Sequence, residues 1–139
     1  MNKKGHSVGA AIASGITLYY LKDTIIVETI TIGGVIVGSF WSDLDAEYSF
    51  IKSKLPIIPN IIEFIQKVLP ENNITCHRGA LFHSIWTLIP FAIFYKVPFV
   101  LGMGIGILGH HILDMTTPAG LRWLYPYKVK LHVWRKIKK

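Results

Sequence analysis

Histidine and aspartate side chains lie at the borders of apolar segments in this chain of 139 residues. Imidazole nitrogens and carboxylate oxygens are ligands of divalent metals such as zinc, manganese and magnesium. If the apolar segments form an up-and-down helical path, all of these side chains fall at the same end of it. The set comprises His6, Asp43, Asp45, His77, His83, His110 and Asp114. We therefore predict a site for one or two divalent ions, with Zn²⁺ favoured over Mn²⁺ or Mg²⁺.

Two of these clusters have spacings that suit a shared ion. His110 and Asp114 are four residues apart, so on a helix they share one face, whereas His111 is turned about 100° away. Asp43 and Asp45 are carboxylates close enough to repel each other unless a cation or a proton relieves them. Taken singly, each cluster also fits a simpler interpretation, a polar pair at a helix end or a solvated turn.

A third cluster, His77-Arg78-Gly79 followed by His83, precedes another apolar segment. His77 and His83 can share a metal if His77 lies in a non-helical turn, which Gly79 permits. Arg78 can hold a phosphate or carboxylate oxygen with two parallel hydrogen bonds. This cluster adds an anion-binding group to the predicted metal site.

Composition predicts the helical scaffold that must position these residues. Hydrophobic residues make up 51% of the chain, charged residues 17%, and the mean hydropathy is +0.42, values typical of a membrane protein or a deeply buried bundle. Four apolar stretches have neither period-two alternation nor a clean polar face, so each is predicted to be a helix buried all round. They cover residues 7–21, 24–41, 81–95 and 97–113, with Pro90 expected to kink the third. At 15 to 18 residues they leave spanning and peripheral insertion both open.

Two further segments complete the predicted fold, an all-α, four-helix antiparallel membrane bundle. Residues 57–69 place isoleucines at helical spacing and are bounded by prolines, which predicts an amphipathic helix on the bundle surface. The tail, residues 122–139, holds seven of the fifteen Lys and Arg residues, interleaved with apolar ones as in an interfacial helix. Anionic lipid is its favoured partner, nucleic acid and plain solvation being the alternatives. Residues 1–121 form the helical metal-site domain, and the tail belongs to the same domain without folding independently.

Charge counting predicts the orientation. Antiparallel stretches would put thirteen basic residues on the side of both termini and two, Lys22 and Lys96, on the other. By the positive-inside rule the first side is cytoplasmic, and it carries every candidate ligand. The predicted location is therefore the inner membrane, crossed several times, with termini and metal site in the cytoplasm. A competing interpretation of the N-terminal stretch is that residues 1–14 form a secretory signal and not part of the first helix. The single cysteine, Cys76, allows no intrachain disulfide.

A glycine pattern in the fourth stretch has a structural explanation. Residues 104–109 match GxGxxG, but they lie inside an apolar helix without a preceding strand, which argues against dinucleotide binding. Gly102 and Gly106 are four residues apart and would instead let two helices approach closely.

The ordered motifs resemble those of the YdjM-like family of inner-membrane-associated hydrolases. The matching positions are His6 and Gly9; Gly38, Asp43 and Asp45; His77, Arg78, Gly79, His83 and Ser84; and His110, Asp114, Thr117, Pro118 and Gly120. The resemblance implies an all-helical fold distantly similar to zinc-dependent phospholipases C and single-strand nucleases, and metal-dependent hydrolysis of a phosphoester. The sequence departs from the family pattern in three ways: Ser42 replaces a proline, Ala46 replaces a common histidine, and the interval from His77 to His83 is one residue longer.

These observations predict a membrane-associated, metal-dependent hydrolase. Metal-activated water would attack a phosphoester, with a lipid-type substrate favoured because the site lies at headgroup level. Asp45 would accept the proton of the water, and Arg78 would stabilise charge on a phosphoryl oxygen. The alternative is a non-catalytic membrane regulatory or interaction protein that keeps the metal site. Ion transport is disfavoured because Glu28 is the main charged group within the apolar stretches.

Overall fold

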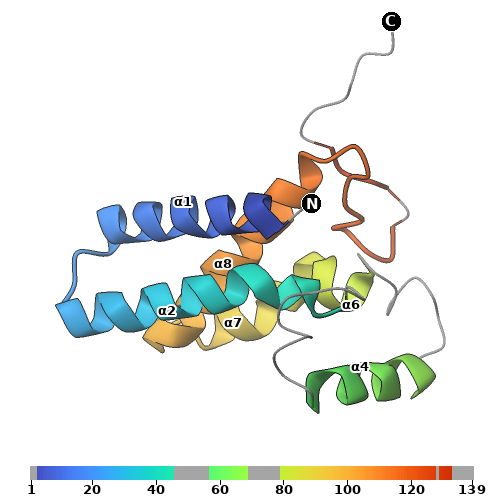
Figure 1. The fold of residues 1–139 in the computed structure, drawn as a ribbon, viewed down its shortest axis with the longest axis horizontal. Coiled ribbons are helices and arrows are strands. Elements are labelled where there is room, and N and C mark those ends of the chain that lie inside the picture. The colour runs from blue at the N-terminus through green and yellow to red at the C-terminus, as the bar shows by residue number, and fades with distance from the viewer. Residues whose placement is uncertain (1–2, 46–56, 69–78, 128, 133–139) are drawn as a thin grey trace, which may run out of the picture.

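Three long helices form the body of the protein. The computed structural model describes residues 3–45, 57–68, 79–127 and 129–132. Helices α1 (Lys3–Leu21), α2 (Ile25–Trp41) and α8 (Pro98–Met115) lie side by side (Figure 1). Across the described residues the chain is mostly helical, and its only β pairing there is an isolated bridge. The predicted all-helical class is confirmed.

Helices α2 and α8 pack in parallel through glycines. Gly34 faces Gly102 and Gly38 faces Gly106, so both helices point the same way along their contact. A Cβ atom on any of these four residues would collide with backbone atoms of the other helix. The small residues therefore let the two backbones touch, as predicted for Gly102 and Gly106.

Helix α1 runs antiparallel to this pair. It turns into α2 through residues 22–24, and α2 begins where the Thr24 side chain accepts a hydrogen bond from the Val27 N–H. Gly9 of α1 contacts the Leu113 side chain, and Ala13 lies opposite Gly109, which fixes the direction. The beginning of α1 and the ends of α2 and α8 consequently meet at one end of the molecule (Figure 1).

The third apolar stretch is not one helix, contrary to the prediction. It consists of α6 (Ala80–His83), the 3₁₀ turn η2 (Ile85–Leu88) and α7 (Ile89–Ile93). The break falls at Ser84, whose backbone is extended, and the next N–H, of Ile85, donates to the Trp123 carbonyl instead of continuing the helix. The predicted kink at Pro90 is also wrong, because this proline lies in the first turn of α7, where its missing N–H costs nothing.

Of the two outer segments, the amphipathic helix forms as predicted, whereas the tail does not. The predicted amphipathic helix is confirmed as α4 (Ile57–Val68), with Ile57, Ile61 and Phe64 exposed. The described part of the tail is not helical, against the expected interfacial helix. Gly120 has a φ of 62°, the chain turns, and Leu121 and Leu131 pair in an antiparallel bridge.

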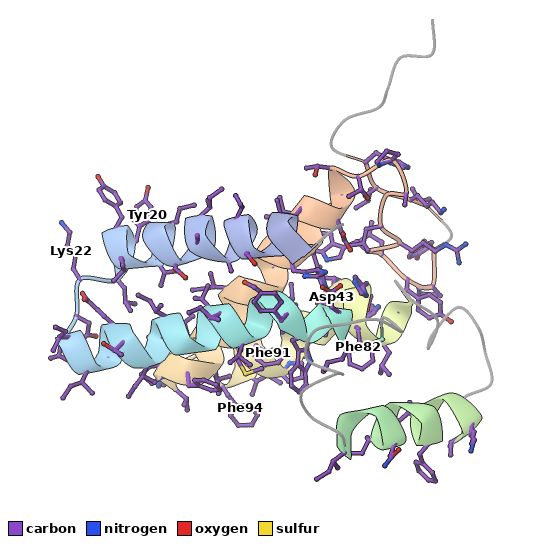
Figure 2. All side chains as sticks on the ribbon, viewed as in Figure 1. Tyr20, Lys22, Asp43, Phe82, Phe91 and Phe94 are labelled. Carbon is purple, nitrogen blue, oxygen red and sulfur yellow. The ribbon has the colours of Figure 1, made fainter. Side chains whose placement is uncertain are left out.

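The long helices bury several polar side chains and expose many large aliphatic ones. Small and polar side chains are buried between them together with Val35 and Ile107, whereas many large aliphatic side chains are exposed on the outside (Figure 2). The buried hydroxyls of Thr17, Thr31 and Ser39 each donate to the carbonyl four residues earlier, so they need no partner on another helix. The outward set includes Ile12, Ile16, Ile26, Ile30, Ile36, Leu108 and Ile112. Such an apolar outer surface suits contact with lipid.

Two segments are long and apolar enough to cross a membrane. They are Ile25–Leu44 and Pro98–Met115, of which 33% and 44% respectively are buried within the protein. The apolar helix Ser7–Leu21 is shorter. More than half of each longer segment is thus not buried within the protein. The prediction that these helices are buried on all sides by other parts of the protein is therefore wrong.

The glycine contact predicts different effects for two adjacent substitutions. Gly34→Ala should destabilise the protein by about 1–3 kcal/mol, since its Cβ would overlap the Phe99 carbonyl oxygen. Gly33→Ala is the matched control, because a Cβ there meets no atom within 4 Å. Thermal unfolding in detergent should show a lower midpoint for the first variant only. Equal midpoints would contradict the proposed contact.

Candidate metal centre

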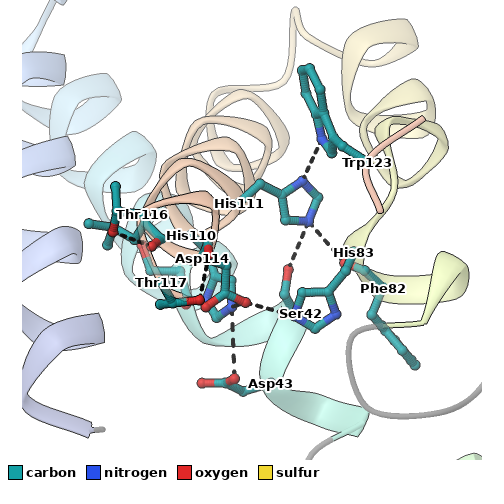
Figure 3. A network of polar contacts seen from close by, with 12 residues as sticks. Ser42, Asp43, Phe82, His83, His110, His111, Asp114, Thr116, Thr117 and Trp123 are labelled. Carbon is teal, nitrogen blue, oxygen red and sulfur yellow. Dashed lines mark hydrogen bonds and ion pairs between the residues drawn. The ribbon is translucent and has the colours of Figure 1, made fainter. Parts of the chain in front are cut away.

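Four acidic and imidazole side chains converge where α2 and α8 end. Asp43 comes from the 3₁₀ turn η1 (Ser42–Asp45) that follows α2, and His83 from the end of α6. His110 and Asp114 lie one turn apart on α8 (Figure 3). Both histidine side chains are fully buried, Asp114 is 3% exposed, and Asp43 is 21% exposed. Residues far apart in the sequence thus form one buried cluster that opens toward solvent at Asp43.

The distances between ligand atoms fit a bound cation. Asp43, His83 and His110 each offer one ligand atom within 4.8 Å of the others. Asp114 Oδ2 lies 3.5 Å from His83 Nε2 and 3.6 Å from His110 Nε2, and Asp43 Oδ1 lies 3.8 Å from His110 Nε2. Tetrahedral zinc with bonds of about 2.1 Å separates its ligands by about 3.4 Å. The cluster is therefore slightly wider than a filled tetrahedral site.

The proton on His110 identifies which of its nitrogens can bind a metal. His110 Nδ1 lies 2.8 Å from the Ser39 carbonyl oxygen, which can only accept a hydrogen bond, so Nδ1 carries the proton. In the neutral ring Nε2 then bears a lone pair, and it faces Asp43 and Asp114. A lone pair beside two carboxylates is electrostatically unfavourable unless a cation or a second proton lies between them. A histidine fixed by a backbone carbonyl in this way has the usual arrangement of a metal ligand.

The parallel helices add to the negative potential of the cluster. The last carbonyls of a helix lack partners within the helix, and its C-terminal end carries about half a negative charge. Because α2 and α8 are parallel, two such ends meet at the cluster, together with the carboxylates of Asp43 and Asp114. The end of the molecule is thus suited to a cation.

The structure brings together four of the seven predicted metal ligands: Asp43, His83, His110 and Asp114. His6 lies in α1 and Asp45 in η1, but their side chains are outside the described part of the structure. His77 and the predicted anion-binding residue Arg78 also lie outside the described residues. Sequence reasoning missed the role of the Ser39 carbonyl, although its position among the last carbonyls of a predicted helix was a signal that it needed a donor.

The GxGxxG segment lies within α8, so its glycines form no phosphate-binding loop. Their place in the helix agrees with the interpretation that they serve packing.

The fold and the cluster define a class: a helical, membrane-associated protein with a buried group of histidines and aspartates at metal-binding distance. Within that class the chain belongs to the YdjM inner membrane protein family, whose family model matches residues 1–139. No curated protein and no solved structure matches the chain. The family and the two apolar helices together support membrane association.

Removing one carboxylate charge should weaken metal binding. Asp114→Asn keeps the shape of the side chain but removes the charge that lies against both histidines, so we expect affinity for Zn²⁺ to fall at least 10-fold. Asp23→Asn removes an exposed carboxylate in the distant α1–α2 turn and should leave affinity unchanged. Metal titration of the purified, metal-stripped proteins measures both. Unchanged affinity in Asp114→Asn would exclude this residue as a ligand.

Proposed function

We propose that this protein is a membrane-bound, metal-dependent hydrolase of phosphoesters. The observation that carries the proposal is the orientation of His110, whose Ser39-bound ring directs the nitrogen lone pair toward two carboxylates in a buried cluster. Asp43, His83, His110 and Asp114 would hold one divalent ion, with zinc favoured by the two imidazoles. A second ion would require side chains outside the described residues, such as those of His6, Asp45 and His77.

The chemistry follows from the donor set and from the access to it. A divalent ion in such a site lowers the pKa of a coordinated water, which makes hydroxide available near neutral pH. Asp43 is the most exposed of the four ligands, so a substrate would approach from its side of the cluster. Asp45, two residues further on, would accept the proton of the water, and Arg78 would stabilise charge on a phosphoryl oxygen.

A lipid-type phosphoester is the substrate that the location favours. The cluster lies at the end of two helices, each of a length to cross the apolar layer of a membrane. Ligands at the end of such helices would lie at the depth of lipid headgroups. A phosphoester there could reach the exposed side of the cluster without leaving the membrane surface.

Hydrolysis should depend on the cluster and on a metal. We expect His110→Ala and Asp43→Ala to lose both bound metal and hydrolysis of phosphodiester and phosphomonoester substrates, by at least 100-fold. His132→Ala, an exposed histidine in the tail, serves as control and should retain both. The measurements are elemental analysis and a substrate screen on the purified proteins. Full activity of the two cluster variants would exclude this function.

The burial of the cluster favours one alternative, a non-catalytic regulatory protein in which the metal stabilises the fold. With three of four ligands at 3% exposure or less, an ion there would be nearly enclosed, as in a structural site. In that case metal removal would lower the thermal midpoint while the wild-type protein hydrolyses none of the substrates.

We also propose that the four apolar stretches form an antiparallel membrane bundle, crossing several times with the cluster and both termini in the cytoplasm. Tyr19 and Tyr20 at the end of α1, Lys22 in the turn after it, and Tyr95 and Lys96 in the second turn are exposed at the end away from the cluster. Tyrosines beside lysines are typical of membrane interfaces. The thirteen basic residues assigned to the other side support its cytoplasmic location.

This topology predicts the side from which introduced cysteines react. In a Cys76→Ser background, Lys22→Cys and Lys96→Cys should react with a membrane-impermeant maleimide in intact spheroplasts, because the two turns would face outward. Lys130→Cys, in the exposed tail segment, should react only after lysis. Labelling of the tail cysteine in intact spheroplasts would refute the orientation.

A further inference from the structure

His111 binds groups from three parts of the chain beside the metal cluster. It follows His110 on α8 and is completely buried. Its Nδ1 lies 3.1 Å from the Trp123 indole nitrogen, and its Nε2 lies 3.0 Å from the Phe82 carbonyl oxygen and 3.4 Å from Ser42 Oγ (Figure 3). Every polar atom of the ring therefore has a partner.

These partners allow only one tautomer of the neutral ring. An indole N–H can only donate, so His111 Nδ1 must accept and carries no proton. The Phe82 carbonyl can only accept, so Nε2 carries the proton and donates it. Ser42 Oγ, at the longer distance, is a second and weaker acceptor. Since both nitrogens are occupied, His111 is not a metal ligand although it lies next to one.

The groups held by His111 adjoin the ligands. Phe82 directly precedes His83, and Ser42 directly precedes Asp43. The His111 ring is also stacked on His83, with ring centroids 5.8 Å apart and planes inclined by 27°. One side chain of α8 thus fixes α6 and η1, the two elements that supply the other ligands. The support matters most for His83, because α6 has four residues and a helix so short is not stable alone.

Trp123 belongs to the segment that follows α8, and this segment is itself anchored. The Trp123 carbonyl accepts the N–H of Ile85, and the bridge between Leu121 and Leu131 closes the loop around it. The indole is thereby held at a fixed place against His111. Nothing in the sequence pattern of the basic tail indicated such a contact.

We propose that His111 is a positioning residue for the metal cluster. Trp123, by donating to its Nδ1, would hold the neutral ring in the tautomer whose Nε2–H donates to the Phe82 carbonyl. The segment after α8 is then part of the support of the metal site. The proposal rests on the proposed metal centre and adds to it two residues that touch neither metal nor substrate.

Two tryptophan variants test this proposal against a general effect of the tail. Trp123→Phe removes the indole N–H that binds His111. Trp86→Phe is the matched control. It removes an indole hydrogen bond of 2.6 Å to the Tyr125 carbonyl, in the segment that carries Trp123, and it does not involve His111. The full-length proteins in detergent are titrated with Co²⁺, whose visible absorption reports ligand geometry.

We expect Trp123→Phe to weaken Co²⁺ binding about 10-fold and to alter the absorption bands, as is usual when a supporting hydrogen bond around a metal site is lost. Trp86→Phe should bind within twofold of wild type, with an unchanged spectrum. Wild-type affinity and spectrum in Trp123→Phe, or equal weakening in both variants, would overturn the positioning role while leaving the metal centre intact. A wild-type protein that binds no Co²⁺ would overturn both proposals.

A second measurement reads the ring directly. In protein labelled with ¹⁵N-histidine, the His111 signals, assigned by their loss in His111→Gln, should show a proton on Nε2 in the metal-free wild type. Trp123→Phe should give a mixture of the two neutral forms. A proton on Nδ1 in the wild type would overturn the proposed arrangement.

Discussion

The close parallel packing of α2 and α8 is the constraint on which the rest of the structure depends. Four glycines allow the two backbones to touch, and no side chain intervenes to separate them. At that distance the Ser39 carbonyl at the end of α2 is within reach of the His110 ring on α8. The same packing brings two helix C-termini together, so the position of the cluster and its negative potential have a common origin. Larger residues at the glycine positions would therefore change both the position of the cluster and its negative potential.

The interior of the protein combines apolar side chains, such as Val35 and Ile107, with a similar number of buried polar ones. The buried side chains include Thr17, Thr31 and Ser39, which satisfy their hydroxyls within their own helices, and then the histidines and Asp114 at one end. In lipid the large aliphatic side chains gain little from facing inward, so close packing of small residues can hold helices together. Side-chain hydrogen bonds between different elements lie at and beside the cluster, where His110 and His111 bind groups of other segments.

The sequence was sufficient to predict the long helices, the amphipathic helix α4 and the convergence of Asp43, His83, His110 and Asp114, because these depend on periodicity and on which segment ends meet. It was insufficient for the break at Ser84, since the Ile85 N–H donates to the carbonyl of Trp123, 38 residues away along the chain. The folded tail was missed for the same reason. Its alternation of basic and apolar residues suits an interfacial helix, whereas Gly120 and the pairing of Leu121 with Leu131 impose a turn.

The parallel direction of α2 and α8 has a consequence for how the chain threads a membrane. If both helices span it, they enter from the same face, so the intervening residues 46–97 must cross an odd number of times. Among the described residues between them, the apolar segment with the right course is 80–93, which passes from His83 beside Asp114 to Phe91 beside Gly104. If α2 and α8 both span the membrane, the segment that carries His83 would therefore be a further crossing, even though it is broken at Ser84.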